Sequence, residues 1–180
     1  MLQNIFSLVV NTVASVLGGV LLLRFWMQVI RVRPPATIGQ FIFQISDWLV
    51  RSLRRLLPGV GGIDWASLVG AYLMALTVVA VDLWLAGVFS YGAIVVLALL
   101  RLCEWIFYGF MASLIIDAVF SWVNPHAPLA PFVRALNDPL LRPLRRVIPL
   151  VGNIDLSPLV ALVLLQIGLR IVSTVLVGAL

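Results

Sequence analysis

The sequence predicts an all-α integral membrane protein made of two tandem, parallel repeats, each a transmembrane hairpin with an interfacial amphipathic helix. Three observations support this fold class: 63% of the 180 residues are hydrophobic, only 11% are charged, and an arginine-rich motif recurs after 91 positions. Soluble domains contain roughly a quarter charged residues. With so few polar groups this chain cannot cover a surface in water, so a membrane protein is expected.

Four long apolar segments are the predicted membrane-spanning helices. They cover about residues 3–30, 65–89, 92–123 and 156–178. Each is longer than the ~20 residues that an α-helix needs to cross a hydrocarbon core of ~30 Å. The other spanning solution, a closed barrel, needs ~10-residue strands of alternating hydrophobicity, and the sequence does not contain them.

A duplicated motif lies in the two connectors, which join the first span to the second and the third to the fourth. Residues 49–69 read LVRSLRRLLPGVGGIDWASLV, and residues 140–160 read LLRPLRRVIPLVGNIDLSPLV, which align without a gap. A tight turn at 90–92 joins the second and third spans. We therefore expect a first repeat at residues 1–90 and a second at residues 91–180. Because each repeat crosses the membrane twice, both point the same way.

The distribution of arginine predicts the orientation. All twelve basic residues are arginine, and nine of them lie in the connectors or at their edges: Arg31, Arg33, Arg51, Arg54, Arg55, Arg134, Arg142, Arg145 and Arg146. The opposite turn and both termini carry none. By the positive-inside rule, we expect a multi-pass protein of the bacterial inner (plasma) membrane with cytoplasmic connectors and periplasmic or extracytoplasmic termini.

Each connector is predicted to contain an amphipathic helix at the membrane interface, because its basic residues recur at helical spacing opposite apolar ones. The arginines of these helices are Arg51, Arg54 and Arg55 in the first repeat and Arg142, Arg145 and Arg146 in the second. We interpret them as topology signals that bind anionic lipid headgroups, each contributing roughly 1 kcal/mol. A specific ligand or partner site is the alternative.

The rest of the motif is interpreted as a device that turns the chain back into the bilayer. Its residues are Asp47, Pro58, Asp64, Asp138, Pro149 and Asp155. Asp138-Pro139 is typical of a helix start, and the two other prolines would end the interfacial helices. Asp64 and Asp155 would cap the following spans. They could also pair with the arginines at 54–55 and 145–146 and clamp each hairpin.

The two copies of the connector motif resemble a known family. The doubled pattern, above all DPLLRPLRRVIPLVGNIDLSPLVALVLLQ, is similar to the YggT family of bacterial and plastid membrane proteins, also called YlmG. The match covers both repeats, and the first copy departs from it by lacking the proline at Trp48 and the Ser-Pro pair. The resemblance implies association with osmotic-shock tolerance, potassium uptake and cell-division gene neighbourhoods in bacteria, and with nucleoid distribution or cytochrome maturation in plastids.

Six charged residues lie inside the predicted spans: Arg24, Asp82, Arg101, Glu104, Asp117 and Arg170. Each would cost at least ~2.5 kcal/mol if unpaired at the bilayer centre, so we expect them to face one another or a polar cavity. Their depths predict that Arg24 pairs with Asp117, that Asp82 lies level with Arg101 and Glu104, and that Arg170 reaches Glu104. Such a network either holds the helices together or lines an ion or proton path.

No pattern in the sequence supports catalysis, a cofactor or a metal site. The single histidine, His126, and the single cysteine, Cys103, are far apart, so the usual metal ligands are missing. The sequence also lacks a G-x-S-x-G elbow, a phosphate-binding loop and a haem attachment motif. We expect a non-enzymatic protein without cofactors and without direct nucleic-acid contact.

Two functional classes remain open. The first is a scaffold, assembly or membrane-organisation factor linked to osmotic-stress tolerance or cell division. The second is a small potassium or proton conduit, or a channel subunit, acting in osmotic balance. Nothing resembles a selectivity filter, and the positive and negative charges inside the spans balance, so we favour the scaffold. Four helices with small-residue patches make a poor pore alone, so we expect a homo-oligomer or a larger membrane complex.

Overall fold

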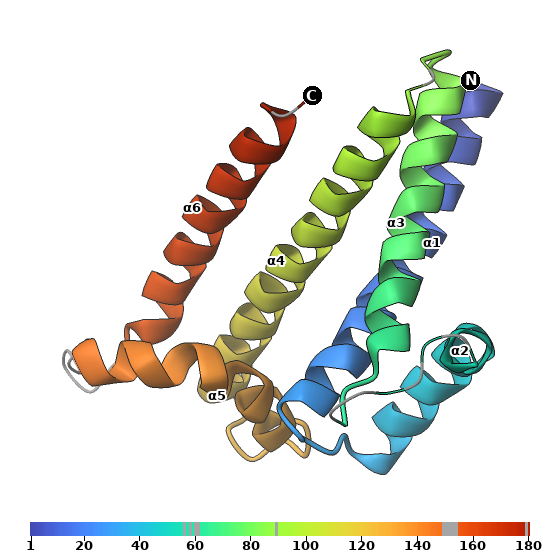
Figure 1. The fold of residues 1–180 in the computed structure, drawn as a ribbon. Helices are drawn as coiled ribbons and strands as arrows, with labels where there is room; N and C mark the ends of the chain where they lie inside the picture. Colours follow the sequence, from blue (N-terminus) through green and yellow to red (C-terminus); the bar gives the residue numbers. More distant parts are fainter. Residues whose placement is uncertain (56, 58, 60–61, 89, 149–154, 179) are drawn as a thin grey trace.

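The computed structural model describes residues 1–55, 57, 59, 62–88, 90–148, 155–178 and 180. In this part of the chain there are six α-helices: α1 (Leu2–Val29), α2 (Ala36–Arg54), α3 (Trp65–Leu85), α4 (Tyr91–Val123), α5 (Ala130–Val147) and α6 (Ser157–Val177) (Figure 1). Helices α1, α3, α4 and α6 are long and apolar enough to cross a membrane, which confirms the four predicted spans.

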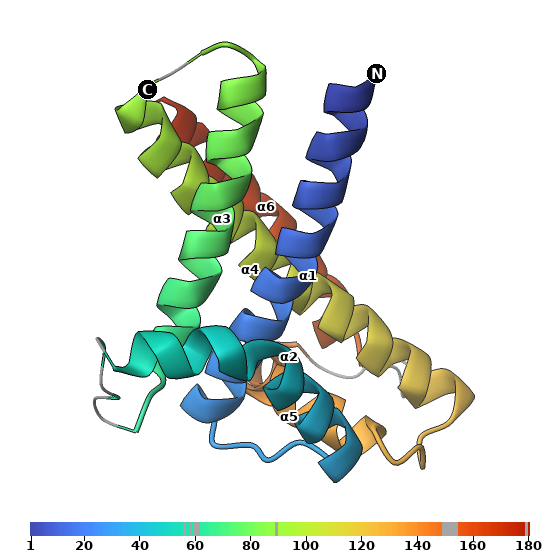
Figure 2. The ribbon, with the colours of Figure 1, turned by 90° about the vertical axis from the view of Figure 1, so that its right-hand side faces the viewer.

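The helices are arranged with the connectors at one end and the termini at the other. Figures 1 and 2 show both chain ends and the turn between α3 and α4 at the same end of the molecule, while α2 and α5 cross the opposite end. This is the arrangement that two parallel hairpins require. The assignment of the connector end to the cytoplasm rests on the positive-inside rule and stays a prediction.

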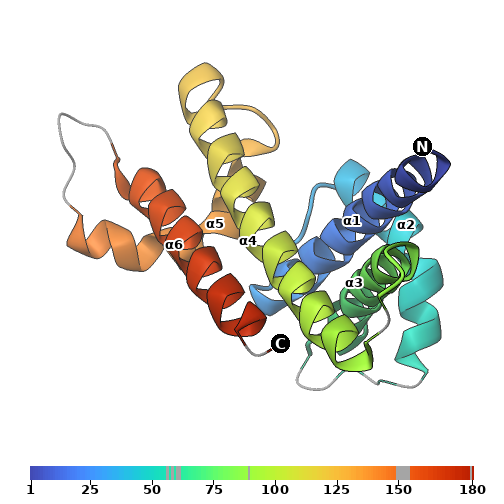
Figure 3. The same ribbon diagram turned by 90° about the horizontal axis from the view of Figure 1, so that it is seen from above.

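The two repeats use the same order of elements. In each, a span leads into a helix that lies across the bundle end and then into a second span, which packs back on the first: α1 on α3, and α4 on α6. Contacts of α3 and α1 with α4 join the two units. Helix α6 packs on α4 and α5 and stands at the edge of the bundle, as the view from above shows (Figure 3).

Helix α4 is longer than a bilayer core requires. Its 33 residues correspond to about 50 Å of helix, against a hydrocarbon thickness of ~30 Å. A span that is too long adapts by tilting. In Figure 2, α4 indeed crosses α1 and α3 obliquely.

The interior of the first repeat is built from small residues on α3 and leucine side chains from α1 and α2. Ala66, Ala71 and Ala75 on α3 are fully buried. An added Cβ at Gly70, on the same helix, would lie 3.3–3.4 Å from leucine side chains of the two neighbouring helices. Small residues let membrane helices approach closely, because packing rather than the hydrophobic effect drives their association in lipid.

Both connector helices are amphipathic, as predicted. On α2 the buried residues Gly39, Ile42, Ser46 and Val50 recur every three or four positions and face the bundle. The exposed side of this helix carries Arg51 and other polar side chains, together with the aromatic side chains of Phe41 and Trp48, which are both 59% exposed. A helix with one apolar face and one charged face is suited to lie along a membrane surface.

The predicted start of the second connector helix is wrong. Helix α5 begins at Ala130 with a proline in its first turn, and both Pro139 and Pro143 lie inside it. Each internal proline removes one helical N–H donor and leaves the carbonyl four residues earlier without its usual partner. The helix continues because Phe132 and Leu141 are buried against the spans, so packing offsets the lost hydrogen bonds. Pro58 and Pro149, the other predicted helix ends, lie outside the described residues.

Candidate functional site: charge clamps at the connector end

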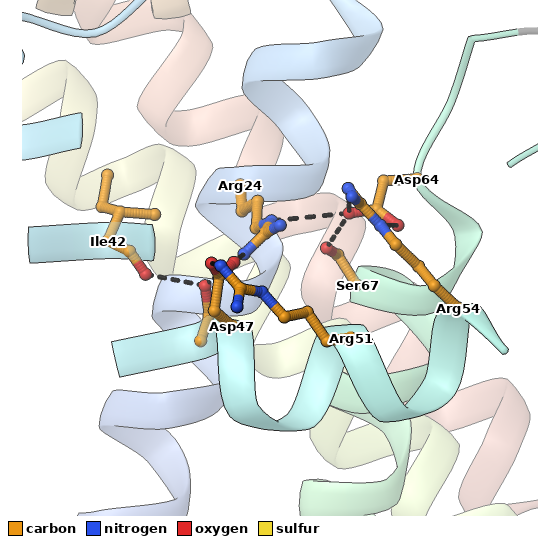
Figure 4. A network of polar contacts seen from close by, with 8 residues as sticks. Arg24, Ile42, Asp47, Arg51, Arg54, Asp64 and Ser67 are labelled. Carbon is orange, nitrogen blue, oxygen red and sulfur yellow. Dashed lines mark hydrogen bonds and ion pairs between the residues drawn. The ribbon is translucent and has the colours of Figure 1, made fainter. Parts of the chain in front are cut away.

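A buried arginine ties the first three helices together. The side chain of Arg24 on α1 is 4% exposed, and its Nη1 group donates to Asp47 Oδ1 and to Ser46 Oγ on α2, both at 2.7 Å. Its Nε lies 3.4 Å from Asp64 Oδ2, at the start of α3 (Figure 4). The Arg24 guanidinium also stands 4.9 Å from the centre of the Phe43 ring, a favourable cation–π distance. One cation therefore joins α1, α2 and α3.

Two further arginines, both more exposed than Arg24, bind the same aspartates. We call the cluster of Arg24, Asp47, Arg51, Arg54 and Asp64 the clamp of the first repeat. Arg54 donates to both carboxylate oxygens of Asp64, at 3.1 and 2.6 Å, and Arg51 donates to Asp47 at 2.8 Å (Figure 4). The predicted pairing of Asp64 with Arg54 is therefore present. Asp64 also occupies the N-cap position of α3, but no capping hydrogen bond from the helix backbone reaches its side chain; the carboxylate accepts from Ser67 Oγ at 2.8 Å instead.

These contacts keep both carboxylates ionised. The hydrogen bond from Arg24 is the main cause that lowers the pKa of Asp47, against a smaller opposing effect of burial. Burial raises the pKa of Asp64, but the hydrogen bonds from Arg54 and Ser67 offset it, so that the pKa is lowered overall. The buried charge of Arg24 is thus compensated at neutral pH, as a cation removed from water requires.

The predicted pair between Arg24 and Asp117 is wrong. Arg24 points into its own repeat, whereas Asp117 on α4 lies 3.8 Å from Nε of Arg134 on α5. The two residues were matched by depth in the bilayer. Depth sets the level of a side chain, but the rotation of its helix decides which neighbour it faces, and α1 turns Arg24 toward α2 and α3.

The second repeat has a clamp at the equivalent positions, but a more open one. Arg145 donates to Asp155 at 2.8 Å and lies 4.0 Å from Asp138, which also accepts from Arg142 at 2.6 Å. The side chains of Asp138 and Asp155 are 39% and 33% exposed, against 26% and 3% for Asp47 and Asp64. The repeat has Ile115 where the first has Arg24, so no buried cation lies between its aspartates.

Leu156, and not Asp155, occupies the N-cap position of α6, so the predicted capping by Asp155 is made from one residue before it. The backbone N–H of Ser157, the first residue of α6, donates to Asp155 Oδ1 at 2.9 Å. Burial raises the pKa of Asp155, but the hydrogen bonds from Ser157 and from Arg145 outweigh it and lower the pKa overall. The carboxylate thus both starts the fourth span and holds the end of α5.

Asp117 and Arg134 form a further link that exists in the second repeat alone. The Asp117 side chain is 8% exposed and that of Arg134 is 51% exposed. Nearby, the fully buried Asn137 donates to the carbonyl of Ser113 at 3.0 Å and so fastens α5 to α4. Sequence reasoning counted Arg134 as a topology signal and missed Asn137. The repeat could have indicated that Arg134 faces the span. It aligns Arg134 with Phe43, whose ring lies beside the Arg24 guanidinium.

A second polar group lies toward the end of the molecule that carries the termini. Asp82 on α3 accepts from Ser7 Oγ at 2.6 Å and from Asn11 Nδ2 at 3.1 and 3.2 Å, both on α1. On α4, Arg101 and Glu104 pair at 3.2 Å, as their spacing predicted. Asp82, Arg101 and Glu104 border one cavity of about 150 Å³, so they are brought together as expected. Ser7 and Asn11 were missed, although their spacing of four places both on one helix face.

Arg170 does not join this group, so its predicted contact with Glu104 is wrong. Its side chain is exposed on α6. The chain has seven carboxylate residues, all within the described segments, and each ion pair they make there is with another arginine. The prediction failed because α6 presents Arg170 on the face that points away from α4.

Comparison with known proteins shows the family to which the chain belongs. A family model described as CCB3/YggT matches the chain twice, at residues 3–85 and 96–176. The chain belongs to this family. It is 33% identical over 171 residues to the YggT protein of Escherichia coli K12, which covers 92% of this chain and 87% of the relative.

Two further relatives are similar over a comparable length. A Pseudomonas aeruginosa protein is 35% identical over 164 residues, covering 88% of this chain and 83% of its own. A Vibrio alginolyticus protein is 32% identical over 168 residues, covering 91% of each chain. The names of these relatives state no activity, and no solved structure matches. The resemblance to the YggT family and its two repeats are thereby confirmed.

This YggT-family chain also contains a larger cavity of about 430 Å³ between α1, α4 and α5. Its walls are apolar and aromatic, and include Leu22, Trp26, Phe110 and Phe132. Such walls suit an acyl chain or an apolar side chain, and Ser113 is the one hydroxyl-bearing residue among the described residues that border the cavity. Within the described segments, no group of three or more His, Cys, Asp or Glu side chains is placed to hold a metal ion.

Proposed function

We propose that this YggT-family membrane protein is a non-enzymatic scaffold or membrane-organisation factor whose connector helices bind anionic lipid headgroups at the cytoplasmic face of a bacterial inner membrane. The observation that carries the proposal is a set of unpaired arginines at the connector end. Within the described segments, no carboxylate pairs with Arg31, Arg33, Arg55 or Arg146.

The charge balance of the connectors supports this assignment. They contain nine arginines and four aspartates, so their net charge of +5 equals that of the whole chain. All four aspartates are used by the clamps: Asp47, Asp64, Asp138 and Asp155. The remaining guanidinium groups are free to bind phosphate oxygens, which arginine contacts with paired hydrogen bonds.

The clamps support the proposal, because they hold the connector helices across the end of the bundle. Arg24 and Arg54 fasten α2 to the spans, and Arg145 fastens α5 to the start of α6. Each clamp fixes an amphipathic helix across the bundle end, with its unpaired arginine at the helix end. A role in osmotic-stress tolerance or cell division follows from the family resemblance and is part of the proposal.

Lipid binding by the protein in nanodiscs tests the proposal. The double variant Arg55→Gln/Arg146→Gln removes one unpaired arginine from each repeat. At roughly 1 kcal/mol per arginine, the preference for phosphatidylglycerol over phosphatidylcholine should fall by about 2 kcal/mol, or about 30-fold, at low salt. The matched control is Arg51→Gln/Arg142→Gln, which removes the same charge from arginines that are already paired. We expect a clearly smaller loss there, and equal losses in the two variants would refute the assignment.

A conduit for potassium or protons is the second candidate function. The observation that favours it is the cavity bordered by Asp82, Arg101 and Glu104 within the spans. Liposomes that contain only this protein distinguish the two functions. The scaffold proposal expects potassium and proton flux no faster than in empty liposomes. Flux that Glu104→Gln abolishes would replace the scaffold by the conduit.

A further inference from the structure

Helix α6 is one of the two least covered spans of the bundle, together with α4. In the described part of this helix, Ser157 and Ala161, both in its first two turns, are the buried residues. The helix packs on α4 and α5 and stands at the edge when viewed from above (Figure 3). Most of its length therefore faces lipid or another membrane protein.

The uncovered surface of α6 is not uniformly apolar. Gln166, Arg170 and Thr174 are all exposed and recur every four residues, so they lie on one face of the helix. Leu159 and Val163, which are 61% and 47% exposed, continue the same face toward the connector end. We call these five residues the α6 stripe. Thr174 donates its hydroxyl to the carbonyl of Arg170 at 2.9 Å, so within the described segments Gln166 and Arg170 are the stripe residues whose side-chain donors have no partner. Lipid tails offer polar side chains no hydrogen bonds, so two such residues on the outward face of a span are typical of a helix–helix contact.

The polar residues of the α6 stripe lie well inside the hydrocarbon region. Gln166 stands near the middle of α6, about 14 Å from Ser157 and about 16 Å from Val177, at 1.5 Å per residue. Arg170 is about 10 Å from the nearer helix end. Side chains on a helix lean toward its N-terminus, which in α6 is the more distant, connector end. The geometry thus opposes the extension of Arg170 to the nearer headgroups.

No carboxylate among the described residues compensates the charge of Arg170. Five arginines have no carboxylate partner in the described segments, and Arg170 is the one of them that lies in a span. A guanidinium inside the bilayer is costly unless it is paired, so such residues mark functional contacts. What compensates Arg170 must come from outside this chain.

We propose that the α6 stripe docks a transmembrane helix of another membrane protein, which presents a carboxylate to Arg170 and a hydrogen-bonding side chain to Gln166. A second copy of this chain fits less well, because a two-fold contact through α6 would bring Arg170 against Arg170. The inference goes beyond the lipid-binding scaffold, because it concerns the interior of the bilayer and holds whatever the connectors bind.

Photo-crosslinking in the native membrane tests the proposal. A photoreactive p-benzoylphenylalanine replaces Val163 on the stripe or, as a matched control, Leu164, which is similarly exposed at 50% against 47%. The two positions share the same depth and differ by ~100° around the helix. We expect a discrete protein adduct from position 163 and none from position 164. The adduct should fall about tenfold or more with Arg170→Gln, which removes the buried ion pair, and persist with Arg170→Lys.

The partner is then identified by mass spectrometry and tested by exchange of charges. Arg170→Glu should abolish the adduct, and replacement of the partner's carboxylate by arginine should restore it. An adduct of two copies of this chain, equal adducts from both positions, adducts to lipid alone, or an adduct indifferent to Arg170→Gln would each overturn the proposal. The thermal midpoint of purified Arg170→Gln should match that of the parent, and a fall of several degrees would reveal a partner inside the chain and overturn it too.

Discussion

The substitution Arg24→Gln measures how much the buried clamp of the first repeat contributes to stability. Arg24 makes two charged hydrogen bonds, to Asp47 and Ser46, and a third contact to Asp64, with a side chain that is 4% exposed. Breaking a buried ion pair costs ~3–5 kcal/mol. Because both aspartates keep a second arginine, we expect the lower end of this range, about 3 kcal/mol.

The assay is the thermal unfolding midpoint of the purified protein, followed by tryptophan fluorescence. For a chain of this size, ~1 kcal/mol shifts the midpoint by ~2–4 °C, so we expect a decrease of about 6–12 °C for Arg24→Gln. The control is Arg51→Gln. Arg51 is 78% exposed in an i,i+4 pair with the same aspartate, and such pairs contribute only ~0.3–0.5 kcal/mol.

A double-mutant cycle locates the effect. Arg24→Gln combined with Asp47→Asn should cost less than the sum of the single variants, since the two side chains are in contact. Arg24→Gln combined with Asp117→Asn should be additive, since these residues belong to different repeats and have different partners. If Arg24→Gln destabilised the protein no more than Arg51→Gln, or coupled to Asp117 instead of Asp47, the clamp described above would be refuted.

Three further predictions follow from the same geometry. Asp117→Asn and Arg134→Gln should be non-additive in thermal midpoint, and strict additivity would show that their 3.8 Å contact contributes nothing. The folded-state pKa of Asp64 is lower than its ordinary value of 3.8, so its contribution to stability is present above that pH and is lost as the pH falls through the folded-state pKa; Asp64→Asn should flatten the acid side of a stability profile, and an unchanged profile would contradict the assignment. In a cysteine-free background, a membrane-impermeant maleimide should label a cysteine at Ser52 from the cytoplasmic side and one at Ser90 from the outside, and the reverse pattern would invert the topology.

The spans were predictable from their apolar composition, and the repeat from a motif that occurs twice in the sequence. A run of twenty apolar residues has one stable solution in lipid, and the motif at 49–69 and 140–160 can be aligned by eye. The start of α5 was not predictable in the same way. Asp138-Pro139 is a strong local start signal, but buried side chains on both sides of it, such as Phe132 and Leu141, carry the helix through the proline. Tertiary packing overrides local preference there.

The charge partners were predictable only where sequence distance decides them. Arg101 with Glu104 follows from a spacing of three on one helix. Pairing of Asp64 with Arg54 follows from the short re-entry segment between them. The partners of Arg24 required the rotation of α1, which an apolar sequence does not reveal because α1 has neighbours on several sides and no strong apolar face.

The two repeats have the same order of helices, but the ion pair between the span and the connector helix has its charges exchanged. In the first, the span carries the cation, Arg24, and the connector helix the anion, Asp47; in the second, the span carries Asp117 and the connector helix Arg134. If α5 docked on α1 in place of α2, Arg134 would take the place of Phe43, whose ring lies 4.9 Å from the Arg24 guanidinium. Two like charges would then meet in a site almost closed to water. This opposition of sign therefore disfavours an exchange of the two connector helices between the spans.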